Sequence, residues 1–213
     1  MKTAYKLTNA DMRAYNGFQW TLNRTMTTSG VGPICGPGWI HTYADPLLAV
    51  LLNPIHANIK RLRLFRVEAS GQSYQDYGLK AGYTSVRLIE ELPVPVVSTA
   101  TRVRFGLYCA LTVSCHKKFV HWATRWLSGI DRNEEAAAAE SQAGAVRAAW
   151  EAWSAAWAAR MEAEARTEKA QAAWAERAAF WAAKAAAEAA SAHRPLIIFA
   201  HAAVAHAKED NDI

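Results

Sequence analysis

The fold of the N-terminal part of the chain is decided by residues 39–52, WIHTYADPLLAVLL. Residues 39–43 combine aromatic and β-branched side chains, which is typical of an extended strand. Asp45 then provides a helix N-cap, and Pro46 occupies the first helical position, where its missing N–H costs nothing. The apolar run predicts a helix to about residue 52, ended by Asn53-Pro54. A strand followed so closely by a capped helix indicates an α+β domain.

Further strands are expected on both sides of this stretch. Their segments alternate polar and apolar residues or are rich in β-branched and aromatic ones. They comprise residues 4–8, 17–22, 62–68 and 85–92. A loop is expected at residues 25–38, where glycine and proline are frequent, and Pro93 and Pro95 end the last strand. These observations predict a small α+β sheet domain at residues 1–97.

The remainder of the chain is predicted to be helical. A connecting helix that covers the sheet is expected within residues 98–129, capped by Ser98 or Thr99, running to about residue 127 and stopped by Gly129. Residues 130–213 form an alanine-rich helical region, because alanine fills about half of residues 134–192 and no proline occurs there. One long helix and a helical hairpin both fit this stretch. A short helix at residues 195–208 completes an α+β fold with a long Ala/Trp-rich helical region.

Charge is distributed unevenly along the chain. Residues 1–128 carry 15 Lys+Arg against 6 Asp+Glu, whereas residues 129–213 carry 9 against 13. A basic N-terminal part suits nucleic acid or an acidic protein, unless its charges are spread evenly and only keep it in solution. The candidate basic patch comprises Lys60, Arg61, Arg63 and Arg66. No recognisable nucleic-acid-binding motif accompanies these residues, so a nucleic-acid partner is the less favoured interpretation.

The sequence contains no strong catalytic or metal-binding signature. Cys35, Cys109 and Cys115 lack a CxxC spacing, and no Cys/His group has the spacing of metal ligands, so neither a metal nor a cofactor is predicted. The residues after Met1 lack the apolar segment of a secretory signal, and no apolar run is long enough to span a membrane. With three cysteines in no disulfide pattern, a cytoplasmic location without membrane association is expected.

Tryptophan gives the alanine-rich region its most specific pattern. In a heptad frame, two tryptophans fall at position a and three at position d, with a polar stretch between two aromatic clusters. They are Trp150 and Trp157 at position a, and Trp153, Trp174 and Trp181 at position d. A buried tryptophan removes about 200 Å² from water, so a row of exposed ones is an aggregation hazard. The stripe is therefore expected to contact the rest of the chain, a second copy or a foreign protein.

Several N-terminal stretches resemble an uncharacterised family of phage and prophage proteins. The resemblance covers about the first 110 residues. It is carried by residues 5–8, 17–20, 35–41 and 45–50. It implies a phage or mobile-element origin and no established activity. Together with the tryptophan stripe, it leads us to expect a phage-type accessory protein that acts through protein–protein binding, as a host-defence inhibitor or a minor virion component, in the host cytoplasm or the virion.

A second and weaker resemblance is to ADP-ribosyltransferases. In that family an extended segment leads into a capped helix and a later strand delivers a glutamate, and residues 38–49 are similar in outline. The resemblance implies a nucleotide-using enzyme with His41, Tyr43 and Glu90 lining a cleft. His41 and Tyr43 are offset from the family's aromatic position, and Tyr5 and Lys6 stand where its first strand has His or Arg. We keep this enzyme as the alternative interpretation.

Overall fold

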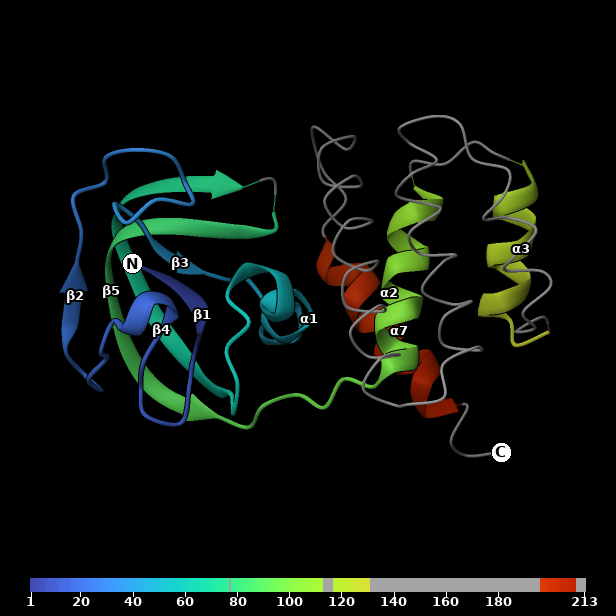
Figure 1. Cartoon of the computed structure of the whole chain (residues 1–213), viewed down its shortest axis with the longest axis horizontal. Coiled ribbons are helices and arrows are strands. Elements are labelled where there is room, and N and C mark those ends of the chain that lie inside the picture. Colours follow the sequence, from blue (N-terminus) through green and yellow to red (C-terminus); the bar gives the residue numbers. More distant parts are fainter. Residues whose placement is uncertain (77, 113–116, 131–195, 210–213) are drawn as a thin grey trace. The chain divides into compact units, whose positions relative to one another are not determined.

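A computed structural model describes residues 1–76, 78–112, 117–130 and 196–209 (Figure 1). The chain divides into two compact units, Met1–Val96 and Val97–Ile213. The alanine-rich stretch at residues 134–192, with the five tryptophans of its stripe, lies outside the described residues. The sheet of the first unit and its helices confirm an α+β fold.

A five-stranded antiparallel sheet forms the first unit. The strands are β1 (Lys2–Thr8), β2 (Thr25–Thr27), β3 (Ile40–Thr42), β4 (Arg63–Asp76) and β5 (Lys80–Leu92). They are ordered β1-β4-β5-β2, and β3 also pairs with β5. Tyr5 and Tyr43 exchange two backbone hydrogen bonds of 2.8 Å each, which link β1 to the end of β3. Strands β1, β4, β5 and β3 are therefore linked in a closed ring. The long strands β4 and β5 are strongly curved and make up much of this ring (Figure 1).

The inner face of the sheet holds the hydrophobic core of this unit. The core residues are Ala4, Trp20, Ile40, Phe65, Val67, Ala69, Tyr83, Val86 and Leu88. Val67, Val86 and Leu88 are completely buried, as expected for strands whose alternate side chains point inward. Each Å² of apolar surface that these side chains bury contributes about 25 cal/mol to the stability of the unit.

Helix α1 (Pro46–His56) confirms the predicted start but not the predicted end. The Asp45 carboxylate accepts hydrogen bonds from the backbone N–H groups of Leu47 and Leu48, at 2.9 and 3.1 Å. The helix continues through Asn53 and Pro54, so the expectation that this pair ends it is wrong. The Asn53 carbonyl accepts from the N–H groups of Ala57 and Asn58, and these bonds close the last turn beyond the proline.

Two local expectations fail in the first unit. Residues 17–22 were predicted to be a strand, but the structure has a 3₁₀ helix at Tyr15–Gly17 and a single bridge between Arg13 and Gln19. The Gln19 side-chain amide donates to the carbonyls of Asp11 and Trp20. These carbonyls are therefore bonded by a side chain and not by the backbone N–H groups of a neighbouring strand. Conversely, β2 lies inside the predicted loop at residues 25–38, because β5 provides its hydrogen-bond partners.

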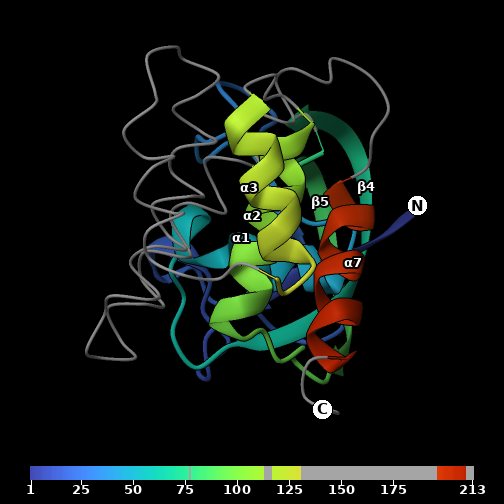
Figure 2. The same ribbon diagram turned by 90° about the vertical axis from the view of Figure 1, so that its right-hand side faces the viewer.

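Helices make up the described part of the second unit: α2 (Thr99–Leu111), α3 (Lys117–Leu127) and α7 (Leu196–Glu209). The expected single helix over residues 98–127 is wrong, because α2 ends at Leu111, where the Thr112 N–H and hydroxyl both bond the Cys109 carbonyl. Ser98 caps its start as predicted. Helices α3 and α7 both contact α2 (Figure 2).

Buried residues at helical spacing explain the contacts of α7. Leu196, Ala200 and Ala203 are buried, which confirms the predicted terminal helix and places its small residues against α2. In the described part of the chain, no helix combines the length and the apolar character needed to cross a bilayer.

Candidate functional site

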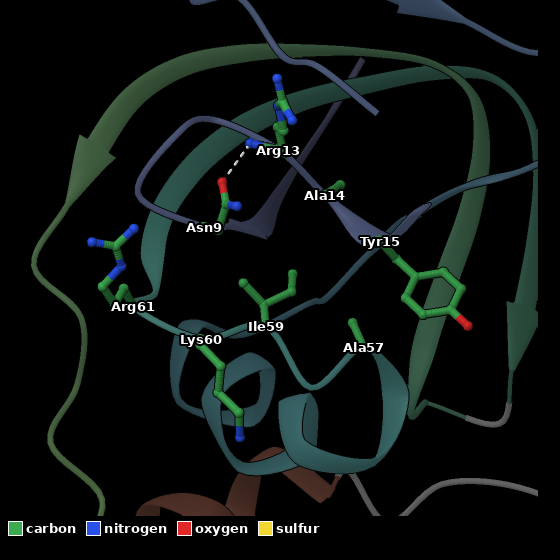
Figure 3. Close-up of a pocket in the computed structure, with 8 residues that line it drawn as sticks. All are labelled: Asn9, Arg13, Ala14, Tyr15, Ala57, Ile59, Lys60 and Arg61. Atoms are coloured by element: carbon green, nitrogen blue, oxygen red, sulfur yellow. Dashed lines mark hydrogen bonds between the residues drawn. The ribbon is translucent and has the colours of Figure 1, made fainter. Parts of the chain in front are cut away.

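A pocket of about 330 Å³ opens on the first unit between two connecting loops (Figure 3). One loop follows β1 and the other follows α1. The lining residues are Asn9, Arg13, Ala14, Tyr15, Ala57, Ile59, Lys60 and Arg61. The pocket therefore combines an apolar floor with amide and cationic side chains, a composition suited to binding a partly polar segment.

Asn9 shapes the first loop. Its side-chain oxygen accepts from the N–H groups of Asp11 and Arg13, at 3.0 and 2.8 Å, and its own N–H donates to the Arg13 carbonyl. Such a side-chain turn permits the positive φ of 61° at Met12. The backbone turns back on itself, and Arg13 and Tyr15 are brought to the rim of the pocket.

Asn53 holds the second loop. Its amide nitrogen donates to the Ile59 carbonyl at 3.0 Å, and its oxygen accepts from the Ile59 N–H at 3.1 Å. Asn53 is only 5% exposed and Ile59 is half-buried, so both bonds are partly shielded from water. Because Ile59 is fixed at both backbone groups, the two residues after it, Lys60 and Arg61, are placed at the pocket.

Three cations line this pocket: Arg13, Lys60 and Arg61. The Arg13 guanidinium donates to the Gln19 side-chain oxygen at 3.1 Å, and the Lys60 ammonium donates to that of Asn58 at 2.7 Å. Arg61 is exposed. Among the residues that the structure describes, no carboxylate lies within ion-pair distance of any of the three. Their charged ends point away from one another (Figure 3), so the rim presents a spread positive field rather than one point charge.

The other two members of the predicted basic patch have a different environment. Arg63 forms a bidentate pair with Glu91, at 2.8 and 2.5 Å, and Arg66 bonds Glu90 at 2.9 Å. These arginines lower the pKa values of the two carboxyl groups through hydrogen bonds and charge. The four residues that the sequence grouped together are thus separated, with Lys60 and Arg61 at the pocket and Arg63 and Arg66 neutralised on the sheet.

Arg13, Asn9 and Tyr15 are pocket residues that sequence reasoning missed. Arg13 lies 47 positions before Lys60 in the chain, and only the fold brings them to one pocket. The available signal was the run Asn9-Ala10-Asp11 after a strand, because Asn and Asp favour turns at strand ends.

His41 and Tyr43, from the alternative enzyme interpretation, lie at and just after β3 and have separate partners. His41 Nε2 contacts the Ile34 carbonyl, and burial lowers the pKa of His41, with smaller contributions from neighbouring charges. The Tyr43 hydroxyl bonds Nδ1 of His56 at 3.0 Å, and the two rings are stacked with centroids 5.8 Å apart. Burial raises the pKa of Tyr43 and, together with Lys80 and His41, lowers that of His56 to about 3.

Glu90 has a different environment from this pair. In β5 the residue opposite His41 is Gly82, whereas Glu90 is opposite Arg66, eight residues further along the strand. The Glu90 side chain is half exposed and bonds Arg66, while Tyr43 is buried and bonds His56. The structure therefore gives Glu90 and Tyr43 separate partners and separate environments.

A buried lysine lies behind His41. The Lys6 ammonium donates to the His41 carbonyl at 2.8 Å and lies 5.2 Å from the Trp20 ring centroid. Burial lowers the pKa of Lys6 to about 8. Since Lys6 is enclosed in the sheet rather than lining a pocket, we regard it as part of the core.

The structure does not describe the predicted tryptophan surface, because its five residues lie outside the described ranges. They are Trp150, Trp153, Trp157, Trp174 and Trp181.

A family model described as "Domain of unknown function (DUF7666)" matches residues 2–100, which span nearly the whole first unit and the start of α2. This supports the expectation of an uncharacterised domain family in the N-terminal part. No curated protein and no solved structure matches the chain.

Proposed function

We propose that the protein acts by protein–protein binding, and that its first unit binds an acidic segment of a partner protein at the pocket formed by Arg13, Lys60 and Arg61. The observation that carries the proposal is the difference between two sets of cations. The arginines of the sheet have carboxylate partners, whereas the three at the pocket have amide partners or an open solvent face. Cations at a concave site that have no carboxylate partner among the described residues favour an external anion.

The local chemistry favours an acidic peptide over nucleic acid. A nucleic-acid surface needs a run of cations that follows successive phosphates. Arg63, Arg66 and Arg87 on the sheet would form such a run, but Glu91, Glu90 and Glu68 pair with them. The pocket also offers Ala14, Ala57 and Ile59 to apolar side chains between acidic ones. A short segment with mixed acidic and apolar residues fits this composition.

The wider role in this proposal is that of a phage-type accessory protein, either an inhibitor of a host defence system or a minor virion component. This part of the proposal rests on the resemblance of the N-terminal stretches to phage and prophage proteins. The tryptophan stripe would provide a second contact surface, to a partner or to another copy of the chain.

A charge-matched pair of variants tests the pocket. In the first variant Arg13, Lys60 and Arg61 are changed to glutamine, and in the second Arg63, Arg66 and Arg87 are changed to glutamine. Both lose three positive charges, so the long-range field changes equally. A fluorescent Glu/Leu-rich peptide and a single-stranded oligonucleotide serve as probes in anisotropy titrations at about 0.15 M salt.

We expect the first variant to bind the peptide at least about tenfold more weakly than the second. This ratio of dissociation constants corresponds to the loss of about 1.4 kcal/mol of binding free energy at the pocket. Equal weakening in both variants would show that net charge, and not the pocket, attracts the peptide. Tighter binding of the oligonucleotide than of the peptide would show that the partner is a nucleic acid.

A further inference from the structure

Cys35 lies in a fixed loop between β2 and β3, away from the basic pocket. The Gly36 N–H donates to the Pro33 carbonyl at 2.8 Å, and His41 Nε2 contacts the carbonyl of Ile34, directly before the cysteine. At the base of the loop the Gly30 N–H donates to the Gly38 carbonyl at 2.9 Å. These bonds hold the backbone on both sides of Cys35, so its sulfur has a defined position.

A lysine contacts this sulfur from the protein side. The Lys80 ammonium donates to Cys35 Sγ at 3.3 Å, and the Lys80 side chain is only 9% exposed. Cys35 itself is exposed. The thiol is thus open to reagents from solvent, while the largely buried Lys80 side chain holds its ammonium against the sulfur.

Two further titratable groups act on Lys80, and Asp76 opposes part of its field on the sulfur. Asp76 is 3.8 Å from the ammonium, farther than the sulfur. His41 also interacts electrostatically with Lys80, and since burial lowers the pKa of His41 the imidazole is neutral near pH 7. Lys80 is therefore the cation closest to Cys35 among the described groups.

We propose that Cys35 is a reactive thiol, activated by Lys80, and that it is a modification site for soft electrophiles and for hydroperoxides. A thiolate is the nucleophilic form of cysteine, and an adjacent ammonium stabilises it. With a hydroperoxide, the sulfur attacks the terminal oxygen, the S–O bond forms and the O–O bond breaks. The sulfur is oxidised to a sulfenic acid, and the released alkoxide or hydroxide takes a proton from water and leaves as alcohol or water.

The chain provides an internal reference for this reactivity. Cys109 in α2 is completely buried, and burial raises its pKa, so it is expected to be inert in the folded protein. Cys109 and Cys115 share the tryptic peptide 105–117, so tandem mass spectrometry after a timed pulse of iodoacetamide is used to assign the label to each of the three cysteines in the full chain. A linear peptide with residues 32–38 gives the rate of the same thiol without the fold.

We expect Cys35 to react about tenfold faster than the same cysteine in the peptide, because the neighbouring ammonium stabilises negative charge on the sulfur as it attacks. Lys80→Met should remove this gain and Lys80→Arg should keep most of it, because arginine retains the charge. Lys2→Met, which removes an exposed lysine elsewhere, should leave the rate within about twofold. A short exposure to hydrogen peroxide followed by dimedone should label Cys35 and not Cys109.

The proposal is overturned if Cys35 in the folded protein reacts no faster than in the peptide, or if Lys80→Met keeps the fast rate. Circular dichroism checks that each variant is folded. Should Lys80→Met unfold, Asp76→Asn provides the second test, because it removes the competing carboxylate and should raise the rate. An unchanged or lower rate in a folded Asp76→Asn protein would also count against activation by Lys80.

Discussion

At the scale of single residues, the Tyr43–His56 pair has a clear consequence for stability. His56 Nδ1 and the Tyr43 hydroxyl are hydrogen-bonded at 3.0 Å, and burial keeps the imidazole neutral in the folded protein near pH 7. Its pKa in the folded protein is lowered to about 3, from the ordinary 6.5 of an unfolded chain. At a pH between these two pKa values, His56 is protonated in the unfolded chain but not in the folded protein. The unfolding free energy must therefore fall as the pH falls through this range.

We predict that His56→Gln reduces this acid sensitivity. Glutamine can still hydrogen-bond the Tyr43 hydroxyl but does not titrate. Between about pH 7 and pH 4 the natural chain should lose about 3 kcal/mol more unfolding free energy than the variant, because each pH unit contributes about 1.4 kcal/mol. Urea unfolding at several pH values measures this difference. Parallel losses in both proteins would show that His56 is not the group responsible.

Charge partners show what single residues in a sequence can and cannot predict about the site. Lys60 and Arg61 were predicted from charge alone and do lie at the pocket. Arg63 was placed with them, but its partner Glu91 is 28 positions away. That pairing depends on the register of β4 against β5, and a single strand carries no information about register.

At the scale of elements, the turn after α1 positions half of the pocket. Asn53→Ala removes both side-chain bonds to Ile59, whose partly buried N–H and carbonyl lose these partners. We predict a loss of about 1–3 kcal/mol in unfolding free energy and weaker binding of the acidic peptide. The control Gln75→Ala changes an exposed amide of β4 and should stay within about 0.5 kcal/mol. If the two variants unfold at the same urea concentration, the role given to Asn53 is wrong.

The elements themselves were predictable where local signals and tertiary contacts agree. The Asp45 cap and the strands around residues 4–8, 62–68 and 85–92 were predicted correctly, because alternation and capping act over a few residues. Residues 17–22 alternate like a strand but have only a bridge, since Gln19 occupies the neighbouring carbonyls with its side chain. Strand β2 has three residues and a threonine-rich sequence, so only its pairing with β5 defines it.

At the scale of the whole molecule, the chain combines a sheet unit with an uneven distribution of charge and aromatic residues. The first 128 residues are basic, whereas the tryptophan stripe falls in the acidic remainder. The basic pocket and the reactive thiol are both on the sheet unit, and they use different loops and different chemistry. Binding at the pocket should therefore survive alkylation of Cys35.

The tryptophan stripe leads to a prediction for the full chain. Changing Trp153 and Trp174 to alanine should weaken self-association or partner binding, or lower the folding stability by about 3–5 kcal/mol for each ring that is buried. Thr167→Ala with Gln171→Ala changes the polar middle of the same heptad frame and should have a much smaller effect. Mass measurements at several concentrations and thermal unfolding compare the two double variants with the natural chain. If both double variants match the natural chain in mass, stability and peptide binding, the rings are not covered by any surface, and the contact role of the stripe is wrong.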